Sequence, residues 1–295
     1  MGEAIRQLEP KALWNHFADL NAVPRPSKKE ERVIQFAKSF GELLNLPTQV
    51  DAVGNVIIKK PASIGMENRQ TVVLQSHLDM VHQKNADTVF DFDKQGIEMY
   101  IDGDWVKAKG TTLGADNGIG VAAIMALLAS TDIAHPPIEA LFTIDEETGM
   151  TGAKGLVGGL LNGTILLNLD TEDDDELTIG CAGGIDVTCT GEYLQEKPKG
   201  DLSLKISIKG LSGGHAGVDI QKGRANANKL MNRLLRKKKK NFSIEIATID
   251  GGSLRNALPR ESVAEIVLDK KKHNELKEAV TKFEKTIKAE HSFTD

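Results

Sequence analysis

The sequence predicts an α/β protein in two parts, and two observations support this fold class. Predicted strands and helices alternate between Val72 and Asp170, an order that is typical of a sheet covered by helices. From about Ile185 the pattern changes to period-two strands and amphipathic helices in the order of a split βαβ unit. We therefore expect one domain over 1–184 and a second, α+β domain over 185–295.

Composition and charge exclude several classes of protein. The 295 residues include 42 acidic and 37 basic side chains, which gives a formal net charge of −5 at pH 7 and argues against nucleic acid as a partner. The one basic run, 236–240, fits the last turn of a helix, where the helix dipole favours cations. Neither a secretory signal nor an apolar run long enough to cross a membrane is visible. We expect a cytoplasmic protein without a membrane partner.

The first domain is expected to begin with two helices and to continue with buried strands. Apolar residues recur at helical spacing over 13–20 and over 33–44. Ser27 and Glu30 have the spacing of a capping box at the start of the second helix. Apolar runs predict strands within 53–60 and at 72–74, 138–144 and 166–169, and a buried helix at 118–129.

In the second domain, period-two alternation predicts strands and apolar stripes predict helices. The strands are expected within 184–194, 201–211, 242–252 and 262–269, and the helices at 225–236 and 273–290. A split βαβ unit needs one more strand after these elements, so this domain is expected to be incomplete.

Side chains of metal-ligand type follow the first buried strand and precede the buried helix. His77 and Asp79 form an H-x-D motif after the strand at 72–74, and period two points both side chains to the same side. Asp116 lies among the glycines of 110–120, just before the helix. Alone, Asp116 fits a helix N-cap better than a metal ligand, because aspartate is a preferred N-cap residue.

Three further carboxylates end the next two strands. Glu146 and Glu147 follow the strand at 138–144, and Asp170 follows the strand at 166–169. Taken singly, the glutamate pair fits a solvated turn and Asp170 fits an acidic surface run. Because the carboxyl ends of parallel strands face one crevice, the whole set predicts a site.

The donor types of this set indicate the metal. One imidazole with several carboxylates suits zinc or another borderline divalent cation rather than calcium. A bridging carboxylate would allow a centre with two metals. Of the adjacent Glu146 and Glu147, one is then expected to bind metal while the other acts as a general base.

The motifs around these residues resemble those of the zinc-dependent metallopeptidases of the aminoacylase and carboxypeptidase type, above all their dipeptidase members. The resemblance runs along essentially the whole chain and rests on LQSHLDMV, KGTTLGADNGIG, TIDEETGM, LLNLDTED, IGCAGGID, KGLSGGHAGVDI, GRANANKL and GGSLRNALPRE. It implies a phosphorylase/hydrolase-like zinc-exopeptidase catalytic domain with a ferredoxin-like α+β lid domain. It also implies two zinc ions, for which Co²⁺ or Mn²⁺ could substitute, and a homodimer formed through the lid domain.

The resemblance also implies roles for the first ligands. His77 and Asp170 would bind the first metal, and Asp79 would orient the imidazole. Asp116 would bridge both metals and would be followed by a cis peptide bond to Asn117. An aspartate at the position of Asp170 is typical of the dipeptidase-like and aminopeptidase-like members.

The remaining roles follow from the same resemblance. Glu147 would bind the second metal, and Glu146 would be the general base. In the lid domain, His215 of GGHAG and Asn256 of RNALP would contact the substrate. The expected activity is hydrolysis of dipeptides, Xaa-His (carnosine-like) and others, by a metal-activated water.

One departure from the family keeps two alternatives open. Members of the family run considerably longer and supply a final histidine to the second metal, so both domains are expected to be incomplete here. Neither His273 nor His291 fits that role, because both lie on or beside the helix predicted at 273–290. The alternatives are a non-catalytic fragment that retains one metal site, and a related amidohydrolase such as a tripeptidase or a deacylase.

Overall fold

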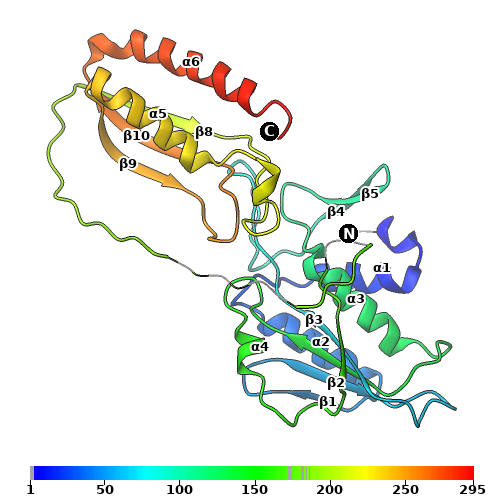
Figure 1. Cartoon of the computed structure of the whole chain (residues 1–295). Helices are drawn as coiled ribbons and strands as arrows, with labels where there is room; N and C mark the ends of the chain where they lie inside the picture. Colours follow the sequence, from blue (N-terminus) through cyan, green and yellow to red (C-terminus); the bar gives the residue numbers. More distant parts are fainter. Residues whose placement is uncertain (1–2, 172–174, 181–182, 184, 186) are drawn as a thin grey trace. The chain divides into compact units, whose positions relative to one another are not determined.

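A five-stranded sheet forms the centre of the first part of the chain, and a three-stranded sheet forms the centre of the second (Figure 1). The computed structural model describes residues 3–171, 175–180, 183, 185 and 187–295, with the backbone alone for 238–240. The chain separates into two compact units, Met1–Ala182 and Gly183–Asp295, and each is described by itself.

The sheet of the first unit has the strand order β1-β2-β6-β3-β7. β3, β6 and β7 run parallel, whereas β2 is antiparallel to β6 and β1 is antiparallel to β2. The bounds are Thr48–Val50 (β1), Val56–Lys60 (β2), Val72–His77 (β3), Ile138–Thr143 (β6) and Ile165–Asn168 (β7). Three neighbouring parallel strands therefore bring their carboxyl ends to one edge of the sheet, as the strand and helix pattern predicts.

Both faces of the central strands β3 and β6 are covered, whereas the edge strand β7 is exposed. Successive residues of a strand point to opposite faces of the sheet. Leu74 of β3 packs on one side in a cluster with side chains of α1, α2 and α3. Val73 packs on the other side against the segment 156–161. The helices are Lys11–Asn21 (α1), Glu31–Leu43 (α2), Ala115–Ala129 (α3) and Thr151–Gly155 (α4), and a hairpin joins Met99–Asp102 (β4) to Trp105–Ala108 (β5).

The second unit is a three-stranded antiparallel sheet with two helices on one side (Figure 1). The strand order is β8-β10-β9, and the central strand alternates buried with more exposed side chains. Leu230 of α5 and Leu276 of α6 share one buried cluster with Ile266 of β10. The bounds are Leu202–Ile208 (β8), Ala227–Phe242 (α5), Glu245–Gly251 (β9), Ser262–Leu268 (β10) and His273–Glu290 (α6), with short 3₁₀ turns at Ile5–Gln7 (η1), Ile220–Lys222 (η2) and Lys270–Lys272 (η3).

The strand predicted within 184–194 is wrong for the part of that segment that the structure describes. Residues 187–194 form no strand, and Val187, Tyr193 and Leu194 are exposed. A period-two pattern becomes a strand only where a neighbouring strand supplies hydrogen bonds and a covered face. β8 pairs with β10 and, among the described strands, none pairs with this segment.

The capping box predicted from Ser27 and Glu30 is also wrong. α2 begins at Glu31, and its N-cap residue Glu30 makes no side-chain capping hydrogen bond. Ser27 Oγ instead donates to Asp79 Oδ2 at 2.8 Å, and Glu30 Oε1 accepts from the N–H of Asp145 at 3.2 Å. Glu30 Oε1 also accepts from the N–H of Lys28 at 2.8 Å. Other partners, two of them distant in the sequence, have therefore replaced the reciprocal pair of Ser27 and Glu30.

Among the described residues, no helix combines the length and apolar character needed to cross a bilayer.

Candidate metal centre

The predicted ligand residues meet at the carboxyl edge of the parallel strands. His77 is the last residue of β3 and pairs in register with Thr143, the last residue of β6. Glu146 and Glu147 lie in the turn after β6, and Asp170 lies two residues after β7. The strand ends therefore carry the residues to one place, as the sequence predicts.

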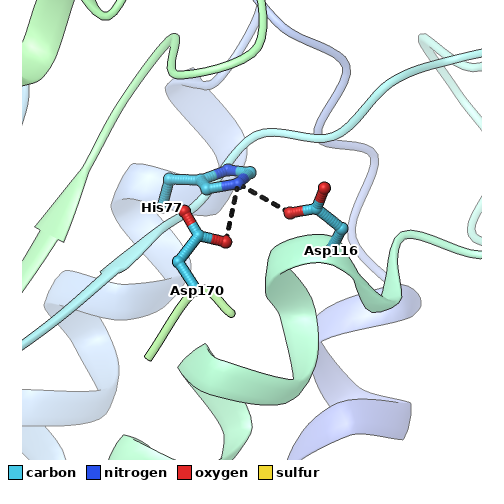
Figure 2. Close-up of side chains that lie close together, drawn as sticks. All are labelled: His77, Asp116 and Asp170. Atoms are coloured by element: carbon cyan, nitrogen blue, oxygen red, sulfur yellow. Dashed lines mark hydrogen bonds and ion pairs between the residues drawn. The ribbon is translucent and has the colours of Figure 1, made fainter. Parts of the chain in front are cut away.

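The imidazole of His77 lies at the centre of this group (Figure 2). Its Nε2 is 3.0 Å from Asp116 Oδ1, 3.8 Å from Asp170 Oδ1 and 4.0 Å from Glu146 Oε2. The possible donor atoms form two sets, and within each set all atoms lie within 4.8 Å of one another. One set is His77 with Asp116 and Asp170, and the other is His77 with Glu146 and Glu147. The imidazole is fully buried, whereas the side chain of Asp116 is 52% exposed, so the group opens to solvent on its carboxylate side.

Burial and neighbouring charges shift the pKa values of the residues in this group. Burial disfavours a charged imidazole, but hydrogen bonds to Asp116 and Asp79 outweigh it and raise the pKa of His77 to about 11. The pKa of Glu147 is raised to about 8, first by burial and then by the negative charge of Asp116. Burial likewise raises the pKa of Asp170 to about 6. A divalent cation would relieve the repulsion among these carboxylates, and imidazole with carboxylate oxygen is a donor set that zinc accepts, so the residues fit a metal.

Asp79 holds both sides of the centre. Its Oδ1 lies 3.1 Å from His77 Nδ1, which fits an orienting partner of a metal-binding imidazole. The same carboxylate accepts from the N–H of Glu146 at 3.0 Å and from the N–H of Glu147 at 3.3 Å. The sequence predicts the contact with His77 but not the two backbone contacts. Asp79 therefore fixes the glutamate turn as well as the imidazole.

Asp116 does not cap α3. The N-cap residue is Gly114 with φ of 71°, and Asp116 has non-helical dihedral angles inside the first turn. The peptide bond from Asp116 to Asn117 is cis, as predicted. Asn117 Oδ1 accepts from the N–H of His77 at 3.2 Å and its Nδ2 donates to Leu169 O at 2.5 Å. These two bonds tie the start of α3 to the ends of β3 and β7, and so bring Asp116 to His77.

His215 and Asn256 lie together in the second unit. Ala216 N donates to Asn256 O at 2.6 Å, and His215 forms an isolated bridge with Ala257. His215 Nδ1 accepts from the N–H groups of Gly217 at 3.1 Å and Val218 at 3.3 Å. These bonds assign the proton to Nε2 in the neutral ring, which leaves Nε2–H as a donor. The contacts predicted between these residues and a substrate stay predictions.

Two residues near the centre carry no signal in the sequence. Ser27 reads as a helix cap, and Arg25 lies in a proline-containing link between two helices, where an exposed side chain is the ordinary expectation. In the structure Ser27 is 6% exposed and Arg25 is 1% exposed. The glycines of 110–120 are the sequence feature that could have indicated a close approach to the start of α3, because glycine lets another group come near the backbone.

Comparisons with known proteins give the relationship of the chain. Residues 55–198 match the model of peptidase family M28, and residues 206–294 match that of the peptidase dimerisation domain. The cytosol non-specific dipeptidase of Escherichia coli (strain K12) is 46% identical over 287 residues, which are 97% of this chain and 59% of that protein. This chain is a homologue of the metallopeptidase-family dipeptidases.

A solved structure extends the likeness of this dipeptidase homologue to the fold. The crystal structure of the aminoacylhistidine dipeptidase from Vibrio alginolyticus is similar with a TM-score of 0.61 at 45% identity, over 100% of this chain and 61% of that one. The chain thus spans about three fifths of the length of these relatives. Its fold is a mixed α/β peptidase catalytic domain followed by a peptidase dimerisation domain.

Proposed function

We propose that this chain carries the metal centre of a cytoplasmic dipeptidase that hydrolyses Xaa-His (carnosine-like) and other dipeptides. The observation that carries the proposal is the meeting of His77, Asp116 and Asp170 with two glutamates at one sheet edge. The name of the Escherichia coli relative, cytosol non-specific dipeptidase, supports both the substrate class and the compartment.

The residues of the centre divide between two metals in this proposal. His77, Asp116 and Asp170 would hold the first ion, and Asp116 and Glu147 would hold the second. Zinc is the proposed metal, and Co²⁺ or Mn²⁺ could replace it. A bound divalent cation supplies Lewis acidity, which acidifies a water molecule and polarises a peptide carbonyl.

The protein side chains move the protons. Glu146 accepts a proton from the attacking water and gives it to the leaving amine. Its side chain is 35% exposed and lies 4.0 Å from the imidazole, and its backbone N–H is held by Asp79, so it is fixed beside the centre but open to a substrate. His215 Nε2–H donates to the substrate carbonyl oxygen as negative charge develops there. Asn256, which lies beside His215, supplies a further substrate contact.

The second unit is proposed to bind a second copy of the chain. The match of residues 206–294 to the peptidase dimerisation domain supports this homodimer. Sedimentation at several protein concentrations measures it, and a monomer at every concentration would contradict it.

Glu146→Gln in the 295-residue chain tests the enzyme proposal. The amide keeps the shape of the carboxylate but cannot accept the proton, so metal content should be unchanged while carnosine hydrolysis falls about a hundredfold to ten-thousandfold. Glu98→Gln, which changes an exposed carboxylate that pairs with Lys109 at 3.3 Å, is the control and should keep full activity. Retained hydrolysis by Glu146→Gln would refute the role of Glu146.

The same measurements separate the alternatives. Because the chain spans 59% of its Escherichia coli relative, a non-catalytic fragment with one metal site is the second candidate. Metal bound at about one ion per chain, with no hydrolysis of any dipeptide, would favour that fragment. Hydrolysis of tripeptides or acyl-amino acids, but of no dipeptide, would favour a related amidohydrolase.

A further inference from the structure

A buried arginine connects the two segments that carry His77 and Asp116. Arg25 follows α1 and is 1% exposed. Its Nη1 donates to Leu78 O and to Asp79 O, each at 3.1 Å, directly after the last residue of β3. Its Nη2 donates to Gly114 O at 2.5 Å, two residues before Asp116. One guanidinium group thus holds the segment after His77 and the loop before Asp116.

The glycines at the start of α3 leave room for this guanidinium group. A Cβ atom added at Gly114 would lie 2.5 Å from Arg25 Nη2, and one added at Gly118 would lie 2.7 Å from the same atom. Real Cβ atoms do not approach other atoms so closely, so any larger residue would displace the arginine. Gly114 and Gly118 of the glycine-rich stretch 110–120 are therefore explained by a side chain of the protein itself.

The hydrogen bonds of Arg25 match the shape of a guanidinium group. Four acceptors on three segments surround its two terminal nitrogens, because Nη2 also donates to Asn21 Oδ1 at 3.0 Å. Arginine presents its N–H donors as a rigid planar fork, whereas lysine presents a compact ammonium on a flexible stem. A lysine at this position could not hold all these acceptors in the same arrangement.

Charge adds to this arrangement. Burial lowers the pKa of Arg25 to about 10, and the negative charges of Asp79, Asp116 and Glu147 oppose that shift, so the group remains charged near neutral pH. Its Nε is buried and has no hydrogen-bond partner in the described part of the chain. A buried cation with an unsatisfied donor lowers the stability of the fold, and an apolar residue of similar size would fill the space with a smaller loss of stability. Stability therefore does not explain the arginine.

We propose that Arg25 is a positioning residue of the metal centre, which holds the imidazole of His77 and the carboxylate of Asp116 at the separation needed to share one cation. This inference rests on the proposed metal site. It assigns Arg25 no contact with substrate or metal. Its effect passes through the backbone of Leu78, Asp79 and Gly114, so loss of Arg25 should alter metal binding even where the fold survives.

Arg25→Lys and Arg25→Met in the 295-residue chain test the proposal, with Co²⁺ as the probe. The first keeps the charge but loses the fork, and the second loses both. Competition with a chelating dye measures the Co²⁺ affinity, the visible absorption of bound Co²⁺ reports the ligand geometry, and circular dichroism gives the Tm. Both variants should lose Co²⁺ affinity by about tenfold to a hundredfold, the range for partners that orient metal ligands, and should change the absorption spectrum.

Lys59→Met is the matched control. It removes a cation that pairs with the buried Glu139 at 2.7 Å near the start of β6, at the opposite end of that strand from Glu146. Its Tm should fall while its Co²⁺ affinity and spectrum remain those of the unsubstituted chain. Arg25 variants that behave in the same way, with lower Tm and unchanged Co²⁺ binding, would overturn the proposal.

Two further outcomes are informative. If the unsubstituted chain binds no Co²⁺, the proposed metal site fails, which differs from a failure of the role of Arg25. If neither Arg25 variant folds, Asn21→Leu compared with Asn21→Asp decides. Both variants lose the Nδ2 donor to Leu113 O, and only Asn21→Leu also removes an acceptor of Arg25 Nη2. Weaker Co²⁺ binding with an altered spectrum in Asn21→Leu relative to Asn21→Asp supports the proposal, and unchanged binding and spectrum overturn it.

Discussion

Metal binding to the centre should release protons, because His77 must lose its proton before it can bind a cation. With a pKa of about 11, the imidazole is protonated at pH 7 in the metal-free protein. Removing that proton at pH 7 costs about 5 kcal/mol, since each pH unit by which the pKa exceeds the pH costs about 1.4 kcal/mol. Glu147, with a pKa of about 8, is also mostly protonated at pH 7.

The sign and the size of the pH dependence follow from these values. Affinity should fall as the pH falls, because protons compete with the cation for the same groups. Binding should release about two protons near pH 7, from His77 and Glu147, and about one near pH 9, where Glu147 is already ionised. The affinity should therefore change about a hundredfold per pH unit near pH 7 and about tenfold near pH 9.

Titration calorimetry with Co²⁺ measures these protons directly. The observed binding enthalpy is measured in two buffers, one with a small ionisation enthalpy (phosphate) and one with a large ionisation enthalpy (Tris). The two observed enthalpies differ by the number of protons released multiplied by the difference between the ionisation enthalpies of the buffers. By NMR, the imidazole of His77 in the metal-free chain should titrate only at alkaline pH. Release of one proton or fewer at pH 7 would refute this reasoning, because His77 and Glu147 together should release about two.

Three substitutions extend these expectations. Asp79→Asn changes the carboxylate that contacts the imidazole and accepts from two backbone N–H groups, so Co²⁺ affinity should fall about tenfold to a hundredfold. An unchanged affinity in dye competition would contradict the orienting role of Asp79. Gly118→Ala should destabilise the chain by about 1–3 kcal/mol in urea unfolding, because its Cβ would meet Arg25 and Phe17, whereas Gly158→Ala, with nothing within 4 Å, should change the free energy of unfolding little. Leu276→Ala removes a buried side chain of the second unit and should cost about 2–5 kcal/mol with Co²⁺ affinity unchanged, and weaker Co²⁺ binding would contradict the assignment of the site to the first unit.

The ligand residues could be predicted from the sequence because each follows a recognisable local pattern. His77 ends a buried strand, Asp79 lies two residues after it, and Asp170 lies two residues after the end of another strand. The register of parallel strands then brings such ends together without further information. The structure confirms this meeting for His77, Asp116 and Asp170, whose possible donor atoms all lie within 4.8 Å of one another. Their roles toward metal and substrate stay predictions.

The supporting residues could not be predicted, because their contacts join distant parts of the chain. Ser27 and Asp79 are 52 positions apart, and Arg25 and Gly114 are 89 positions apart. Local spacing favoured a capping box for Ser27, and tertiary contacts gave it another partner. The strand expected within 184–194 is wrong for residues 187–194 for the same reason, since alternation predicts a strand only when a partner strand exists.

The carboxylate of Asp79 links two parts of the centre that would otherwise vary separately. Its Oδ1 contacts the imidazole of His77 and accepts from the N–H of Glu146, and its Oδ2 accepts from Ser27 Oγ and from the N–H of Glu147. A change in the turn after β6 therefore alters the setting of the imidazole, and a change after β3 alters the setting of the glutamates. For protein engineering, the H-x-D turn and the glutamate turn form one inseparable module. A graft of this centre onto another sheet must carry both turns together with the segment that contains Ser27.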